Sequence, residues 1–98
     1  MRLAIFLNNL DFEGIASKII KILMFDVDNK VIMSIGEETV SLDNKGYLMM
    51  LMFANNIITV YADNLSESLK EMLQKADIEY KSLKDLKNNP IFRPFLIG

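Results

Sequence analysis

The chain contains no cysteine, no histidine and no tryptophan in its 98 residues. Thiol nucleophiles, imidazole acid–base chemistry and soft-metal ligation are excluded together, because these functions need Cys or His side chains. No stretch approaches the ~18 uninterrupted apolar residues of a membrane span. The apolar run after Met1-Arg2 is too short for a signal peptide, so we expect a cytoplasmic protein. We expect no cofactor and no resident metal.

The length and composition indicate a single domain with a surplus of apolar residues. A chain of 98 residues can build one compact core and is too short for a second. Hydrophobic residues make up 51% of the sequence, at the upper edge of the range for soluble domains. Such a surplus is typical of a sheet that is covered on both faces, or of an apolar surface that binds a partner.

Charge is distributed unevenly along the chain. Residues 1–80 carry 7 basic and 12 acidic side chains, whereas residues 81–98 carry 4 basic and 1 acidic. Nucleic-acid binders normally present a basic stripe with interleaved aromatic residues, so the acidic body argues against nucleic acid as a partner. The basic end is interpreted as a solubilising segment, with an anionic partner as the minor alternative.

The first half of the chain predicts three strands and a hairpin. Residues 2–7 form an apolar run, and a polar, turn-rich segment follows at 8–14. Residues 15–21 are ambiguous between a short helix and a strand. Two further strands, at 22–27 and 31–35, flank a predicted tight turn at Asp28-Asn29-Lys30.

The second half predicts helices that alternate with strands. After a polar connection at 37–44, with Asp43 or Asn44 as a cap, residues 47–54 form a helix that is apolar nearly all round and should be buried on two sides. A strand at 57–61, an amphipathic helix with the capping-box spacing Asn64 to Glu67, and a strand at 78–80 complete a βαβ unit. The sequence therefore predicts one α/β domain with a mixed, mostly five-stranded sheet in three layers.

The end of the chain carries a short predicted helix and an apolar tail. We assign residues 1–82 to the α/β domain and residues 83–98 to the helix and tail, as part of the same domain or as an interface. Pro90 and Pro94 favour an extended tail. Such a tail should pack on its own domain, or else dock on a second copy or a partner. The candidate interface residues are Met50, Ile91, Phe92, Phe95 and Leu96.

Four features of the chain resemble one known family. They are the element order, the opening Met1-Arg2-Leu3-Ala4-Ile5, the strand end Phe25-Asp26-Val27-Asp28 and the module NNIITVYADNLSESLKEMLQKADIEY. Over roughly residues 1–82 the chain is similar to the nitrogenase accessory factors, the dinitrogenase iron–molybdenum cofactor biosynthesis family. The resemblance implies a small cytoplasmic protein with a ribonuclease-H-like fold. The family's "AGI" before the final strand corresponds here to Ala76-Asp77-Ile78.

The departures from the family pattern concern its functional residues. Where the family typically carries a Ser-x-His-Phe-Gly-Arg-like stretch, this chain reads Glu13 to Lys18, with Ile15 at the histidine position. The glycine-rich turn before the last helix appears as Asp63-Asn64. Metallocluster carriers need soft or imidazole ligands, which this chain lacks. We interpret the chain as a diverged member that keeps the scaffold and has lost the cluster site.

Three groups of residues could still carry chemistry. Asp26 and Asp28, with Asp11 near them, are carboxylates of the kind that a magnesium site needs, although a strand that runs into an Asp-Asn turn explains them as well. A second set of residues lies near the predicted C-terminal ends of strands, where open α/β sheets bind ligands. These residues could bind a small ligand or anion, or could cap a helix. That tentative ligand-binding set is Asn8, Asp11, Asp63, Asn64 and Ser66. Met49, Met50 and Met52 suit either a core or a partner surface, and Met50 lies off the main helical stripe.

These observations support three hypotheses about function. The first is a non-enzymatic accessory or interaction protein that self-associates through its apolar surplus. The alternative is a module that binds a small ligand or anion at the strand ends. The third is a degenerate magnesium-dependent enzyme centred on Asp26 and Asp28.

Overall fold

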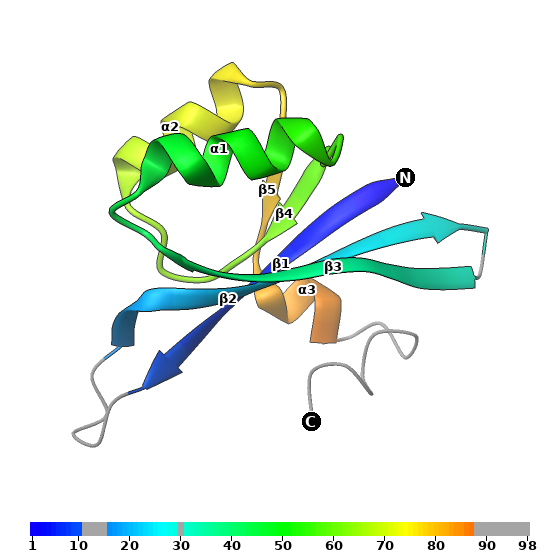
Figure 1. The fold of residues 1–98 in the computed structure, drawn as a ribbon, viewed down its shortest axis with the longest axis horizontal. Coiled ribbons are helices and arrows are strands. Elements are labelled where there is room, and N and C mark those ends of the chain that lie inside the picture. The colour runs from blue at the N-terminus through cyan, green and yellow to red at the C-terminus, as the bar shows by residue number, and fades with distance from the viewer. Residues whose placement is uncertain (11–15, 30, 88–98) are drawn as a thin grey trace.

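A mixed five-stranded sheet forms the centre of the molecule (Figure 1). The computed structural model describes residues 1–10, 16–29 and 31–87. The strands lie in the order β3-β2-β1-β4-β5, and β2 is antiparallel to both of its neighbours, whereas β1, β4 and β5 are parallel. The strand bounds are β1 Arg2–Leu10, β2 Ala16–Asp28, β3 Val31–Ser41, β4 Thr59–Tyr61 and β5 Glu79–Lys81. The predicted mixed α/β sheet is confirmed.

The antiparallel strands are longer than the sequence pattern predicts. Residues 16–21, which read equally well as helix, belong to β2 and pair with both neighbouring strands. The prediction of a polar connection at 37–44 is wrong for its first part, because Glu37 to Ser41 continues β3. This stretch pairs with β2 through its backbone, and its polar side chains lie at the exposed edge of the sheet.

One irregularity divides β3. Met24 of β2 pairs with Gly36 and Phe25 pairs with Ser34, so Ile35 is an additional residue in β3. An extra residue of this kind bends an edge strand and changes which side chains face the core. A Cβ atom at Gly36 would lie 3.0 Å from Cε at the flexible end of the Met24 side chain, so a larger residue at this bend requires Met24 to shift.

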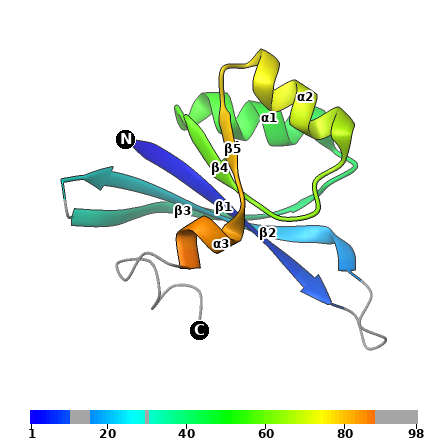
Figure 2. The ribbon, with the colours of Figure 1, turned by 180° about the vertical axis from the view of Figure 1, so that it is seen from behind.

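Helices cover both faces of the sheet. Helices α1 (Lys45–Ala54) and α2 (Glu67–Lys75) lie side by side on one face, and the short α3 (Leu83–Lys87) lies on the other, as Figures 1 and 2 show from opposite sides. The three predicted layers are therefore present. The predicted helix at 83–89 is described as far as Lys87, and residues 88–98 lie outside the described part of the chain.

The alternation of side chains along the strands separates two cores. On the face of α1 and α2, Phe6, Ile20, Ile22 and Val60 pack beneath the helices. The residues on the opposite face are called the second sheet face below: Leu3, Ile5, Phe25 and Leu86 at its centre, with Leu7, Leu23, Val27, Ile32, Tyr61 and Leu83 packed around them. Apolar residues on both faces of β1 and β2 explain why the sequence reads as continuous apolar runs.

Helix ends follow from a few polar residues. Asn44 caps α1 as predicted, through a hydrogen bond from Tyr47 N to its Oδ1 at 3.3 Å. The prediction that Asn64 caps α2 is wrong: Ser66 is the cap, and its Oγ accepts a bond from Leu69 N at 3.3 Å. Asn64 has a φ of 58° instead, which places it in the turn before the cap.

Both long helices end in the same manner. Asn56 follows α1 and Asp77 follows α2, each with a positive φ, of 54° and 58°. The next residue, Ile57 or Ile78, donates its backbone N–H to a carbonyl five residues earlier at 2.9 Å and is buried. These are Schellman motifs, in which a left-handed residue turns the chain back along the helix. The predicted stops at Asn55-Asn56 and Asp77 are confirmed.

Among residues 1–10, 16–29 and 31–87, no helix is both long and apolar enough to cross a bilayer.

Candidate functional site

The outer side of α1 is an apolar surface without charge. The nine residues from Gly46 to Ala54 include no Asp, Glu, Lys or Arg. On the side that faces away from the sheet, Tyr47 is 36% exposed, Met50 53% and Phe53 59%. We call these three residues the α1 outer face. A helix that covers a sheet normally has a polar outer side, so this surface is unusual for a helix in contact with water.

The cap and the helical period set this orientation. Because Asn44 fixes the first turn, Leu48, Leu51 and Met52 point toward the sheet and are nearly fully buried. The spacing of three residues then places Tyr47, Met50 and Phe53 on the opposite side. The prediction that α1 is buried on two sides is therefore wrong for the described residues. Met49 and Met52 fill the core, whereas Met50 lies outside it.

A groove extends the apolar surface toward α2. Lys45 Nζ donates a hydrogen bond to Ser68 Oγ at 2.9 Å, which holds the starts of α1 and α2 together. Toward the other end of the helices, a shallow depression of about 330 Å³ lies between them. Its lining residues are Met49, Phe53, Met72, Lys75 and Ala76. Phe53 thus joins the α1 outer face to this α1–α2 groove.

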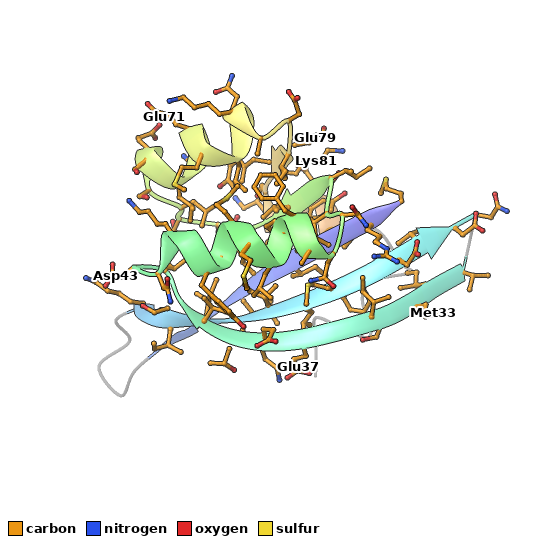
Figure 3. All side chains as sticks on the ribbon, turned by 45° about the horizontal axis from the view of Figure 1, so that its top comes forward. Met33, Glu37, Asp43, Glu71, Glu79 and Lys81 are labelled. Atoms are coloured by element: carbon orange, nitrogen blue, oxygen red, sulfur yellow. The ribbon has the colours of Figure 1, made fainter. Side chains whose placement is uncertain are left out.

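Charged groups lie next to this surface, at the start of α1 and on α2, and Lys75 lines the α1–α2 groove. Figure 3 labels Asp43 at the start of α1 and Glu71 on the neighbouring α2. Asp43 Oδ2 forms an exposed ion pair with Lys18 Nζ at 3.3 Å, and Lys70 Nζ lies 3.4 Å from Glu67 Oε1. An apolar centre with a charged rim is the usual composition of a protein–protein interface.

The predicted ligand-binding residues lie at the end of the sheet where the parallel strands have their C-terminal ends. Asn8 belongs to the last part of β1 and pairs with Ile20, and Asp63 follows β4. Asp11 lies outside the described residues. Ser66 and Asn64 serve the start of α2, as a cap and a turn residue.

At this end of the sheet, the Asp63 side chain forms hydrogen bonds with residues of its own chain. Its Oδ1 accepts hydrogen bonds from Ser82 Oγ at 3.1 Å and from Leu83 N at 3.2 Å. Ser82 Oγ in turn accepts a bond from Lys84 N at 3.1 Å. The carboxylate therefore joins the loop after β4 to the start of α3, and a negative charge at this position disfavours an anionic ligand.

Asp26 and Asp28, the carboxylates of the magnesium hypothesis, lie at the opposite end of the sheet, where β1 begins. Asp26 pairs with Arg2 at the start of β1, and its Oδ2 lies 3.6 Å from Arg2 Nε. Arg2 also donates from Nη1 to Asn55 O, at the C-terminal end of α1, at 3.1 Å. β1 ends at Leu10, the residue before Asp11 in the sequence. Leu10 is about 26 Å from Arg2 at ~3.3 Å per residue, and Asp26 pairs with Arg2, so Asp26 lies at the other end of β1.

The surroundings of Asp26 and Asp28 are partly apolar. The two aspartates line a depression of about 360 Å³ near the β2–β3 turn, together with Asn29, Val31 and Met33. Figure 3 shows Met33 on β3, far from Asp43. Within residues 1–10, 16–29 and 31–87, no three acidic side chains come together in a metal-binding group.

Sequence reasoning missed several residues of these sites. Tyr47 and Phe53 were assigned to a buried helix, although the absence of any charge from Gly46 to Ala54 is visible in the sequence. Ser82 was not considered, although Ser82 and Asp85 have the spacing of a helix start. The candidate interface residues Ile91, Phe92, Phe95 and Leu96 lie outside the described residues.

Comparisons with known proteins show a similar fold. No protein-family model and no curated protein matches this chain. A solved structure described as "Crystal structure of PH0822" is similar to it with a TM-score of 0.54 and 16% sequence identity. The similarity covers 84% of this chain and 78% of that chain. Only the fold is shared. At this identity the match carries no statement about activity or partners.

Proposed function

We propose that this chain is a non-enzymatic accessory protein that binds a protein partner through the α1 outer face. The scaffold in this proposal is that of the nitrogenase accessory factors, with the metallocluster site lost. The mixed sheet in three layers supports the ribonuclease-H-like arrangement that the family resemblance implies. The absence of cysteine and histidine supports the loss of cluster chemistry.

The uncharged outer side of α1 is the observation that carries the proposal. Transfer of apolar surface from water is favourable by about 25 cal/mol per Å². Met50 and Phe53 are each more than half exposed, and the α1–α2 groove continues the same surface. Burial of this surface against a partner therefore provides a driving force for association.

A second copy of the chain is the partner that this surface suits. Two copies related by a two-fold axis present the same patch to each other, and the patch must be self-complementary. With the two α1 helices antiparallel, no like charges meet between Gly46 and Ala54. Each Lys45 then approaches the C-terminal end of the other helix, where the carbonyl groups favour a cation.

The measurement is the molar mass in solution by size exclusion with light scattering. The unmodified chain is expected to elute with about twice the 11.2 kDa mass of one chain. Met50→Glu is expected to give the mass of one chain, since a carboxylate in the interface costs desolvation free energy.

Ile58→Glu is the matched control. Ile58 is 50% exposed, close to the 53% of Met50, but it lies between α1 and β4, outside the α1 outer face. The control is expected to keep the mass of the unmodified chain. A monomer at every concentration of the unmodified chain, or an equal loss of association in both variants, contradicts the proposal.

A further inference from the structure

The open edge of β3 is a surface that the proposed function does not use. β3 is the first strand in the order β3-β2-β1-β4-β5, and no other described strand lies beside it on its outer side. It has 11 residues, whereas β5, the strand at the other edge, has three. Figure 3 shows β3 along the border of the sheet, with Met33 and Glu37 labelled on it. The edge of a long strand presents backbone N–H and C=O groups with which another chain can pair.

The hydrogen bonds of β2 determine which backbone groups of β3 point outward. Val27 N donates to Met1 O at 2.7 Å, so the backbone groups of Val27 face β1. Its partner on β3 is Ile32, and in an antiparallel pair the two residues then point away from each other. The N–H and C=O of Ile32 therefore point away from the sheet. Ser34 lies two residues further along and points the same way.

The outward groups continue beyond the irregularity in β3. Leu42 N donates to Lys18 O at 2.8 Å, so the backbone groups of Leu42 face β2. Because successive residues of a strand face opposite sides, Glu37 and Thr39 point outward. Both parts of β3 therefore offer backbone donors and acceptors to an additional strand.

Two exposed apolar side chains lie beside this edge. Val31 is 65% exposed and Met33 62%. They lie on the same side of the sheet as α1, because Ile32 between them packs on the second sheet face. Together with Asp26 and Asp28 they line the depression of about 360 Å³ near the β2–β3 turn. A strand added at the edge of β3 can cover both apolar side chains.

The charge of this edge favours a basic occupant. Asp28 is exposed and Glu38 is half-buried, and neither forms an ion pair with a described residue. Residues 26–41 include four acidic residues and one basic residue, Lys30. Pairing of this edge with a second copy would bring two acidic segments together, which is unfavourable. A basic segment complements the edge instead.

We infer that β3 binds an extended, basic segment of a partner protein as an additional strand of the sheet. Backbone pairing supplies the affinity in this mode of recognition, and alternate side chains supply the specificity. On the α1 side of the sheet, an apolar side chain of the segment lies next to Met33. The stem of a Lys or Arg lies along Val31 with its charge near Asp28, and a second cation lies next to Glu38.

This surface is separate from the proposed α1 interface. The α1 outer face is turned away from the sheet, whereas the outward groups of β3 lie in the plane of the sheet. Met50→Glu is therefore expected to leave binding at β3 unchanged, and a substitution at the edge of β3 is expected to leave the molar mass of the chain unchanged. The two proposals can thus fail independently.

The probe is a synthetic peptide with blocked ends and the sequence Lys-Thr-Val-Thr-Val-Thr-Lys. Amide hydrogen exchange of the unmodified chain is measured by NMR with and without a saturating concentration of this peptide. The amides of Ile32 and Ser34 are expected to exchange at least about tenfold more slowly with the peptide bound. The amide of Met33 faces β2 and is expected to keep its rate. A control peptide with Glu in place of both Lys residues is expected to give no protection.

Substitutions in the chain test the charge and the backbone contributions separately. Asp28→Asn and Glu38→Gln are each expected to weaken binding of the Lys peptide by about threefold. Glu71→Gln, the same change of charge at an exposed position on α2, is expected to have no effect. Ser34→Pro removes an outward N–H and no bond to β2, and it is expected to weaken binding by at least about tenfold.

The outcomes that overturn the inference are distinct. Equal binding of the Lys and Glu peptides contradicts the basic partner, and this comparison does not depend on the folding of any variant. Unchanged exchange at Ile32 and Ser34, or unchanged affinity of Ser34→Pro for the peptide, contradicts strand addition at β3. A fall in molar mass to that of one chain in Ser34→Pro also overturns the inference, because the edge then binds a second copy.

Discussion

Replacement of Asp63 by alanine should destabilise the fold, because this carboxylate holds α3 in place. Asp63 Oδ1 accepts two hydrogen bonds, at 3.1 Å from Ser82 Oγ and at 3.2 Å from Leu83 N. Hydrogen bonds to charged groups contribute about 1.5–3 kcal/mol each when buried. Asp63 is half-buried and both bonds are long, so we expect a total loss of about 2 kcal/mol, close to the upper range for a lost helix cap.

The assay is thermal or urea unfolding. A loss of about 2 kcal/mol corresponds to a fall in Tm of roughly 10 °C for a domain of this size. Asp63→Asn keeps one oxygen acceptor and should lose about half as much free energy of unfolding, since the acceptor is no longer charged. In a double-mutant cycle with Ser82→Ala, the coupling free energy should be about 1 kcal/mol.

Asp43→Ala is the control for this prediction. Asp43 also precedes a helix, but its side chain is exposed and forms a surface ion pair with Lys18, so its removal should cost less than about 0.5 kcal/mol. If Asp63→Ala and Asp43→Ala have the same unfolding free energy as the unmodified chain, the assignment of Asp63 to the start of α3 is wrong. The ligand-binding hypothesis for Asp63 then regains support.

Four further substitutions test particular elements. Ser66→Ala should lower the free energy of unfolding by about 1 kcal/mol. Asn64→Gly should raise it, because the φ of 58° at Asn64 suits glycine. A lower free energy of unfolding for Asn64→Gly in urea contradicts the assignment of the cap to Ser66. Asp77→Gly should raise the free energy of unfolding by about 0.5 kcal/mol, because glycine is favoured in the left-handed position after a helix; an unchanged or lower urea midpoint contradicts this. Asp26→Asn should change the free energy of unfolding by less than about 0.5 kcal/mol. Millimolar Mg²⁺ should leave the Tm of the unmodified chain unchanged, and a rise that Asp26→Asn abolishes supports the magnesium hypothesis instead.

Local patterns in the sequence predicted most of the elements. The strand at 2–7, the cap at Asn44 and the stops at Asn56 and Asp77 depend on short-range backbone chemistry, which a sequence expresses directly. The mixed sheet also followed from a hairpin and a βαβ unit. These features need no knowledge of which surfaces finally meet.

Features that depend on tertiary neighbours were not predictable in the same way. Glu37 to Ser41 is polar, and it forms a strand because β2 offers a paired edge. Asp63 and Ser82 are 19 residues apart in the chain, and only the parallel alignment of β4 and β5 brings them together.

The exposed side of α1 belongs to this second group. An apolar residue looks the same in the sequence whether it faces a core or solvent. Met50 was separated from the core stripe by its spacing, whereas Tyr47 and Phe53 were not. The position of α1 over the sheet, fixed by Leu48 and Met52, decides which side remains uncovered.

Disulfide formation at position 50 tests the proposed α1 interface most directly. Met50 is the middle residue of the α1 outer face, so a two-fold axis through antiparallel α1 helices brings the two copies of this residue together. Because the chain has no other cysteine, Met50→Cys is expected to give a covalent dimer under mild oxidation, while Ile58→Cys stays monomeric. A Met50→Cys chain that remains monomeric, or the same yield of dimer from both variants, contradicts the account.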